Sequence, residues 1–152
     1  MKKNLVEYFE SIGLTGLLLT KVEPAFHFYT NFIGMQITDA FISEFINKDG
    51  SRVYENIWFF NDDFCGEAKS FMTNEEYDFQ IIKDTISYFN ITKKEYNIVD
   101  DQINDNSRMT LEFGLPDDRL GDLKASKENC KQLTFIFKKY IHPNCSKPLK
   151  SY

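Results

Sequence analysis

The chain has 152 residues, of which 42% are hydrophobic, 27% charged and 16% aromatic, as is typical of one globular domain that buries its own core. A formal net charge of -5 and an isoelectric point near 5.1 oppose electrostatic binding to nucleic acid or anionic membranes, because both depend on concentrated Lys and Arg. A protein partner is expected instead, and a basic partner suits this charge.

The sequence predicts no disulfide, metal or cofactor site. Cys65, Cys130 and Cys145 are odd in number and widely spaced, and only two histidines accompany them. Near the N-terminus, Glu7 and Glu10 soon follow the first lysines, and no small-residue cleavage site or long apolar run is present. We therefore expect a cytoplasmic protein without a secretory signal or a membrane-spanning helix.

The first elements in chain order are helical. Apolar residues recur at spacings of three and four along residues 1–34, which is the period of a helix face. Gly13 and Gly16 interrupt this pattern, and Pro24 fits the first turn of a second helix better than the interior of one long helix. We predict two short amphipathic helices within residues 3–33, which form an N-terminal helical extension.

From residue 35 onward the pattern changes to the alternation that is typical of strands. Asp49 and Gly50 predict a hairpin turn, because glycine adopts the positive φ that tight turns require. About seven antiparallel strands are expected, within residues 37–45, 53–60, 65–71, 79–83, 86–96, 109–113 and 121–125. Residues 100–107 are strongly polar and are predicted to form a loop.

The last predicted element is an amphipathic helix over residues 126–142. Ser126 is a good N-cap, and Glu128 suits the positive end of the helix dipole. Lys138 and Lys139 suit the negative end, and a polar stretch follows them to the C-terminus. This helix is predicted to pack its apolar face on the strands.

Seven short strands followed by one capped amphipathic helix resemble the pleckstrin-homology-like superfold. The resemblance covers residues 36–142 and includes Gly121–Ser126 as the passage from the last strand into the helix. It implies an α+β fold in which the strands form a bent barrel closed by the C-terminal helix. The single domain then consists of an N-terminal helical extension (1–34), the strands (35–125), the closing helix (126–142) and a flexible tail (143–152).

The superfold also implies a binding module, with ligands at the loops of the open barrel end or along a strand edge. In its lipid-binding members the first hairpin carries several basic residues that hold inositol phosphates. Here Lys48 and Arg52 are the candidates, with Asp49 between them, which makes anionic lipid binding one alternative function. Trp58 belongs either to the core or, if its face of the sheet is uncovered, to an interface as an aromatic anchor.

Glu67 and Lys69 on a predicted strand form half of the arrangement that metal-dependent nucleases use. In such a site the carboxylate binds Mg²⁺ and the lysine orients or activates water. An upstream Asp is also required, and Asp49, Asp62 and Asp63 are available. An exposed strand face that carries Glu and Lys is the commoner origin of this pattern, so a metal-dependent hydrolase or nuclease is a second alternative.

No complete catalytic set accompanies these elements, so the sequence favours a small acidic interaction module over an enzyme. Its ligand is expected to be a protein. A sharper hypothesis is an immunity-type inhibitor that neutralises a basic toxin domain of a bacterial competition system. No oligomeric state follows from the sequence.

Overall fold

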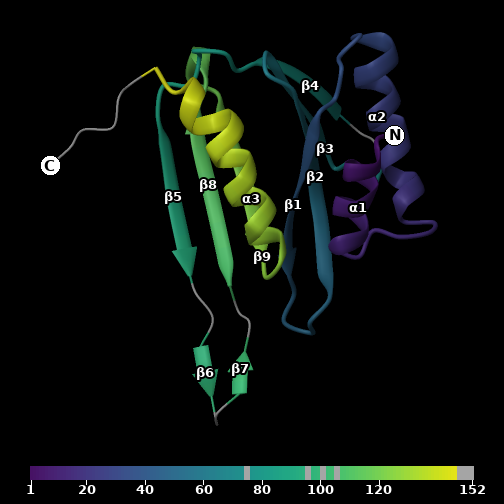
Figure 1. Cartoon of the computed structure of the whole chain (residues 1–152), viewed down its shortest axis with the longest axis vertical. Helices are drawn as coiled ribbons and strands as arrows, with labels where there is room; N and C mark the ends of the chain where they lie inside the picture. Colours follow the sequence, from purple (N-terminus) through teal and green to yellow (C-terminus); the bar gives the residue numbers. More distant parts are fainter. Residues whose placement is uncertain (74–75, 95–96, 100–101, 105–106, 147–152) are drawn as a thin grey trace, which may run out of the picture.

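The structure, a computed structural model, describes residues 1–73, 76–94, 97–99, 102–104 and 107–146. It is an α+β fold in which two antiparallel sheets lie side by side (Figure 1). The first sheet has the order β1-β2-β3-β4, with β1 at Asp39–Ile46, β2 at Arg52–Phe60, β3 at Phe64–Lys69 and β4 at Glu76–Ile81. The second sheet has the order β5-β8-β9, with β5 at Phe89–Lys94, β8 at Arg108–Gly114 and β9 at Leu120–Ser126.

The N-terminal helices cover the outer face of the first sheet (Figure 1). Helix α1 spans Lys3–Ser11, and a second helical run consists of η1 (Leu19–Val22), α2 (Glu23–His27) and η2 (Phe28–Phe32). Their apolar side chains form one core cluster with residues of β1, β2 and β3. Pro24 lies in the first turn of α2, where its missing N–H costs no helical hydrogen bond. The structure thus has the two predicted helical segments.

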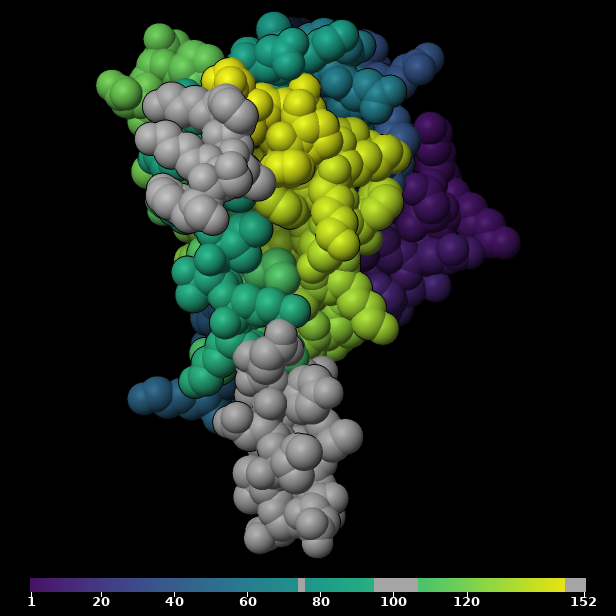
Figure 2. All heavy atoms as spheres, turned by 60° about the vertical axis from the view of Figure 1, so that its left-hand side comes forward, coloured from purple at the N-terminus to yellow at the C-terminus, as the bar shows by residue number. Residues whose placement is uncertain are grey.

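A second core cluster lies between the two sheets and includes the C-terminal helix. Helix α3 spans Asn129–Ile136 and continues through η4 (Phe137–Ile141) and η5 (His142–Asn144). Figure 2 shows the C-terminal helical run at the surface, in yellow, between the teal strand β5 and the purple helix α1. Trp58 is fully buried in this cluster, which gives it a packing role.

The two sheets do not close into the expected barrel within the residues that the structure describes. The edge of β1 faces β9, but side chains replace a backbone ladder there. The Ser43 hydroxyl accepts a hydrogen bond of 2.9 Å from the Lys124 N–H. The Ile42 N–H donates to the Tyr8 hydroxyl at 2.8 Å, and the Ile42 carbonyl accepts from Asn129 at 2.9 Å. Because side chains satisfy this strand edge, the barrel stays open at the β1–β9 seam.

The predicted polar loop at 100–107 contains a strand. Strands β6 (Asn97–Val99) and β7 (Gln102–Asn104) pair with each other and form a short hairpin between β5 and β8 (Figure 1). Residues 100–101 and 105–106 of that loop lie outside the described residues. The loop prediction is therefore wrong for β7, because its polar composition hid the pairing of Ile98 with Ile103.

The passage into the last helix also differs from the prediction. Ser126 ends β9 and does not cap α3, which begins three residues later at Asn129. The Ser126 N–H donates instead to the buried carboxylate of Glu44 at 2.6 Å. Between the end of β9 and the start of α3, Lys127 has a φ of 53°, a left-handed conformation that turns the chain sharply from strand to helix.

The predicted tail from residue 143 is ordered at its start. Cys145 forms a parallel bridge with Ile86, and the Ser146 N–H donates to the Ile86 carbonyl at 2.8 Å. Residues 147–152 lie outside the described part of the chain. Among the described residues, no helix has the length and apolarity needed to cross a membrane.

Candidate functional site

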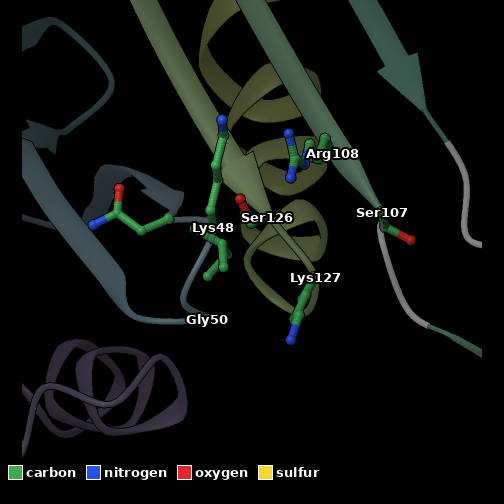
Figure 3. A pocket seen from close by; sticks show the side chains of 8 residues that line it. Lys48, Gly50, Ser107, Arg108, Ser126 and Lys127 are labelled. Atoms are coloured by element: carbon green, nitrogen blue, oxygen red, sulfur yellow. The ribbon is translucent and has the colours of Figure 1, made fainter.

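A basic pocket lies where the β1–β2 hairpin approaches the start of β8 and the connection from β9 to α3 (Figure 3). Its volume is about 300 Å³. We call this cavity the basic pocket, and it is lined by Ile46, Asn47, Lys48, Gly50, Ser107, Arg108, Ser126 and Lys127. The pocket thus joins segments from both sheets.

One wall of the basic pocket is the tight turn between β1 and β2. Gly50 has a φ of 89°, and its N–H donates to the Asn47 carbonyl at 2.9 Å. The Asp49 carboxylate accepts hydrogen bonds from the Ser51 hydroxyl at 2.6 Å and from the Ser51 N–H at 2.9 Å. These bonds, chiefly the one from the hydroxyl, lower the pKa of Asp49. Asp49 therefore closes its own turn.

The opposite wall is held by backbone hydrogen bonds. The Lys127 N–H donates to the Ser107 carbonyl at 2.7 Å, which joins the end of β9 to the start of β8. The Ser126 N–H is fixed by Glu44, whose side chain is fully buried. These contacts keep the backbone of this wall in one arrangement before any ligand arrives.

The basic pocket holds three cations that form no ion pair with a described carboxylate, although Lys127 interacts electrostatically with the adjacent Glu128. Lys48, Arg108 and Lys127 are exposed, and the ion pairs found in the described part of the chain include none of them. Figure 3 shows Lys48 and Arg108 on either side of Ser126, whereas Lys127 points the other way. In a chain with a net charge of -5, this is a local concentration of uncompensated positive charge.

Arg52, the second basic residue expected at this hairpin, points elsewhere. Its Nη1 lies 2.7 Å from Glu128 and donates to the Ile12 carbonyl at 2.8 Å. Its Nε lies 3.3 Å from Oε2 of the buried Glu44, close enough for an ion pair but not aligned for a hydrogen bond. Arg52 therefore ties β2 to the helices, and its charge is already neutralised.

The sequence predicted Lys48 beside a hairpin, and the structure has that hairpin; it did not single out Arg108 and Lys127, which line the same pocket. These two residues come from the start of β8 and from the residue after β9. The chain distance from Lys48 to them gives no signal of proximity. Only the register between β8 and β9, together with the contact of β9 with β1, brings them to the same end of the molecule.

Glu67 faces the space between the sheets and is only 6% exposed. Its Oε2 accepts a hydrogen bond of 3.1 Å from Asn56, and Asp78 lies directly opposite it on β4. Burial raises the pKa of Glu67 to about 7; nearby Asp78 and Glu76 add to this rise, and Lys69 opposes it. Lys69 itself lies 3.9 Å from Glu76.

The hydrolase hypothesis requires an Asp that precedes Glu67 in the chain, but the carboxylate that the fold places beside Glu67 follows it. Asp62 and Asp63 lie in the β2–β3 turn, and Asp63 is 3.9 Å from Lys83. Asp78, which follows Glu67 in the chain, is the carboxylate opposite it. The described residues contain no group of three or more His, Cys, Asp or Glu arranged to hold a metal ion. The hydrolase hypothesis stays a prediction.

Comparison with known proteins adds no family to this description. A scan against family models, a search of curated proteins and a search of solved structures each returned no match.

Proposed function

We propose that this chain is a binding module that holds an anionic group of a protein partner in the basic pocket. The observation that carries the proposal is that Lys48 and Arg108 flank one cavity, that the backbone of Lys127 lines it, and that no described carboxylate forms an ion pair with any of the three. Cations held close together repel one another, and a bound carboxylate or phosphate relieves that repulsion. The pocket therefore suits an anion.

The remaining surface favours a compact anionic group over a long polyanion. Three cations line this one cavity, while the chain as a whole carries a net charge of -5. A nucleic acid or an anionic membrane would extend beyond the pocket and meet this excess of acidic residues. An acidic side chain or a phosphorylated residue of a protein fits within the cavity.

The order of elements supports a binding role in the same way. Antiparallel strands followed by a C-terminal helix resemble the pleckstrin-homology-like superfold, whose members bind ligands at the loops between strands. The basic pocket occupies such a position, at the β1–β2 hairpin. The resemblance is one of architecture, so the chemistry of the ligand is argued from Lys48, Arg108 and Lys127 alone.

The test is the affinity of the chain for a hexa-aspartate peptide, measured by calorimetry at low salt. Arg108→Gln and Lys48→Gln should each weaken binding about tenfold, because each removes a charge-assisted contact worth roughly 1.5 kcal/mol. Lys21→Gln removes the same charge from η1, far along the chain from the pocket residues, and should leave the affinity unchanged.

Inorganic phosphate should compete with the peptide, and added NaCl should weaken both ligands. Equal affinities for the Arg108→Gln and Lys21→Gln variants would refute the proposal. Tight binding to phosphatidylserine vesicles without any binding of the peptide would favour a lipid ligand instead.

A further inference from the structure

The face of the second sheet that points away from the core, which we call the outer face, exposes most of its residues, although Gly114 and Ser126 are buried. Along β8, residues of the outer face alternate with residues that point into the core, which are Met109, Leu111 and Phe113. Cross-strand register places its residues in rows, which are Tyr88, Gly114 and Leu120; Asn90, Glu112 and Asp122; Thr92, Thr110 and Lys124; and Lys94, Arg108 and Ser126. Charge is unevenly distributed along these rows.

One end of the outer face is acidic. Glu112 lies directly opposite Asp122, and Asp117 and Asp118 follow in the η3 turn (Pro116–Asp118) that joins β8 to β9. None of these four carboxylates has an ion pair among the described residues. Like charges directly opposite each other destabilise a sheet, so the chain alone leaves this end uncompensated.

The other end of the same face is basic. Lys94 lies directly opposite Arg108, again a pair of like charges, and Arg108 lines the basic pocket beside Lys48 and Lys127. Arg108 and Glu112 are four residues apart on β8, which is roughly 13 Å and exceeds the distance of about 8 Å over which salt screens charges at physiological ionic strength. The two ends therefore act as separate and opposite electrostatic surfaces.

Apolar side chains are exposed at the acidic end. Tyr88 is 42% exposed and its ring lies over Gly114, where any side chain would clash with it. Leu120, in the next strand, is 54% exposed. With Asp118 and Arg119 they line a cavity of about 380 Å³. Exposed aromatic and aliphatic residues next to unpaired charges are typical of a protein interface.

We infer that the outer face docks a second copy of this chain, antiparallel across a two-fold axis. Each copy would place its β8–β9 turn, with Asp117 and Asp118, at the basic pocket of the other. The acidic end and the basic end lie on the same face of one chain. An antiparallel dimer therefore forms two identical acidic–basic contacts and leaves neither end free to bind a third copy. This inference rests on the proposed function, because it names the anionic group that the basic pocket holds.

The test is a charge swap read by sedimentation velocity. The native chain should form a dimer that dissociates as NaCl is raised. Asp122→Lys reduces the acidic end from four negative charges to a net of two, and Arg108→Glu reduces the basic end from four positive charges to a net of two. Each variant alone should therefore dimerise more weakly than the native chain at the same salt concentration. Mixed together, the two variants should associate more tightly than either variant alone, because one of the two contacts then joins an unaltered basic end to an unaltered acidic end.

Asp122→Lys also separates association from folding. It replaces a like-charge pair with an opposite-charge pair to Glu112, so the variant should be at least as resistant to urea as the native chain. Its basic pocket is untouched and should still bind inorganic phosphate.

A native chain that is monomeric at low salt but binds phosphate would overturn the inference and leave the proposed function intact. A native chain that does not bind phosphate would overturn both this inference and the proposed function. A dimer unaffected by either variant, or a mixture that associates no more tightly than the single variants, would place the contact on another surface and reject the inference.

Discussion

Among the carboxyl groups, Glu67 has a pKa that the fold raises into the neutral range. It extends from β3 into the space between the sheets and lies beside Asp78. It accepts one side-chain hydrogen bond, from Asn56. Burial disfavours its charged form, and one amide donor does not compensate, so its pKa rises to about 7. Near neutral pH the folded chain therefore binds a proton that the unfolded chain releases.

The stability of the chain should fall as the pH rises from about 4.5 to about 7. In this window the folded state binds more protons than the unfolded state, so the free energy of unfolding decreases with pH and levels off above about 7. Glu67→Gln should remove much of this decrease and stabilise the chain at alkaline pH by up to about 3 kcal/mol. Urea unfolding followed across this range measures the effect.

Glu23→Gln, an exposed change on α2, is the matched control and should leave the pH profile unaltered. An identical decrease of stability in the Glu67→Gln variant would show that another group is responsible. Glu44 is the first alternative, because burial raises its pKa in the same direction.

At the scale of elements, the seam between β1 and β9 decides how the two sheets meet. The register of β1 shifts between Ser43 and Glu44, and the side chains there point toward β9. Asn129 is fully buried at the start of α3 and donates to Glu44 at 3.1 Å as well as to the Ile42 carbonyl. It also accepts from the Tyr8 hydroxyl at 2.8 Å, so it joins α1, β1 and α3.

Asn129→Ala should destabilise the chain by about 2–3 kcal/mol, because the buried Ile42 carbonyl loses its donor and the Tyr8 O–H loses its acceptor. Gln132→Ala removes a single hydrogen bond, to the Ala40 carbonyl, and should cost about 1 kcal/mol. Chemical denaturation of both variants measures the difference. Equal losses would mean that the Asn129 contacts do not act as the link between the elements.

The sequence could predict the elements themselves better than this seam. Alternation of apolar residues locates the strands, and the glycine of the β1–β2 turn has the positive φ that was expected. Ser43 and Glu44, in contrast, are polar residues that are both buried at this seam. A buried polar residue is recognisable only through its partners, and Asn129 is far away in the chain.

At the scale of the whole molecule, sequence reasoning described the average charge but not its distribution. An acidic composition indicates a basic partner, yet the cavity that joins both sheets is lined by Lys48, Arg108 and Lys127. Arg52 resembled a ligand-binding residue because it flanks the first hairpin, but Glu44 and Glu128 neutralise it. Which cations stay unpaired depends on tertiary contacts, and the order of residues along the chain does not encode those contacts locally.

Titration of the isotopically labelled chain with inorganic phosphate, followed by amide NMR at low salt, tests the anion-binding pocket most directly. We predict saturable shifts centred on the amides of Gly50, Arg108 and Lys127, and their loss in the Arg108→Gln variant. Shifts that are small and spread evenly over the chain, or that centre on another surface, would contradict an anion-binding role for the basic pocket.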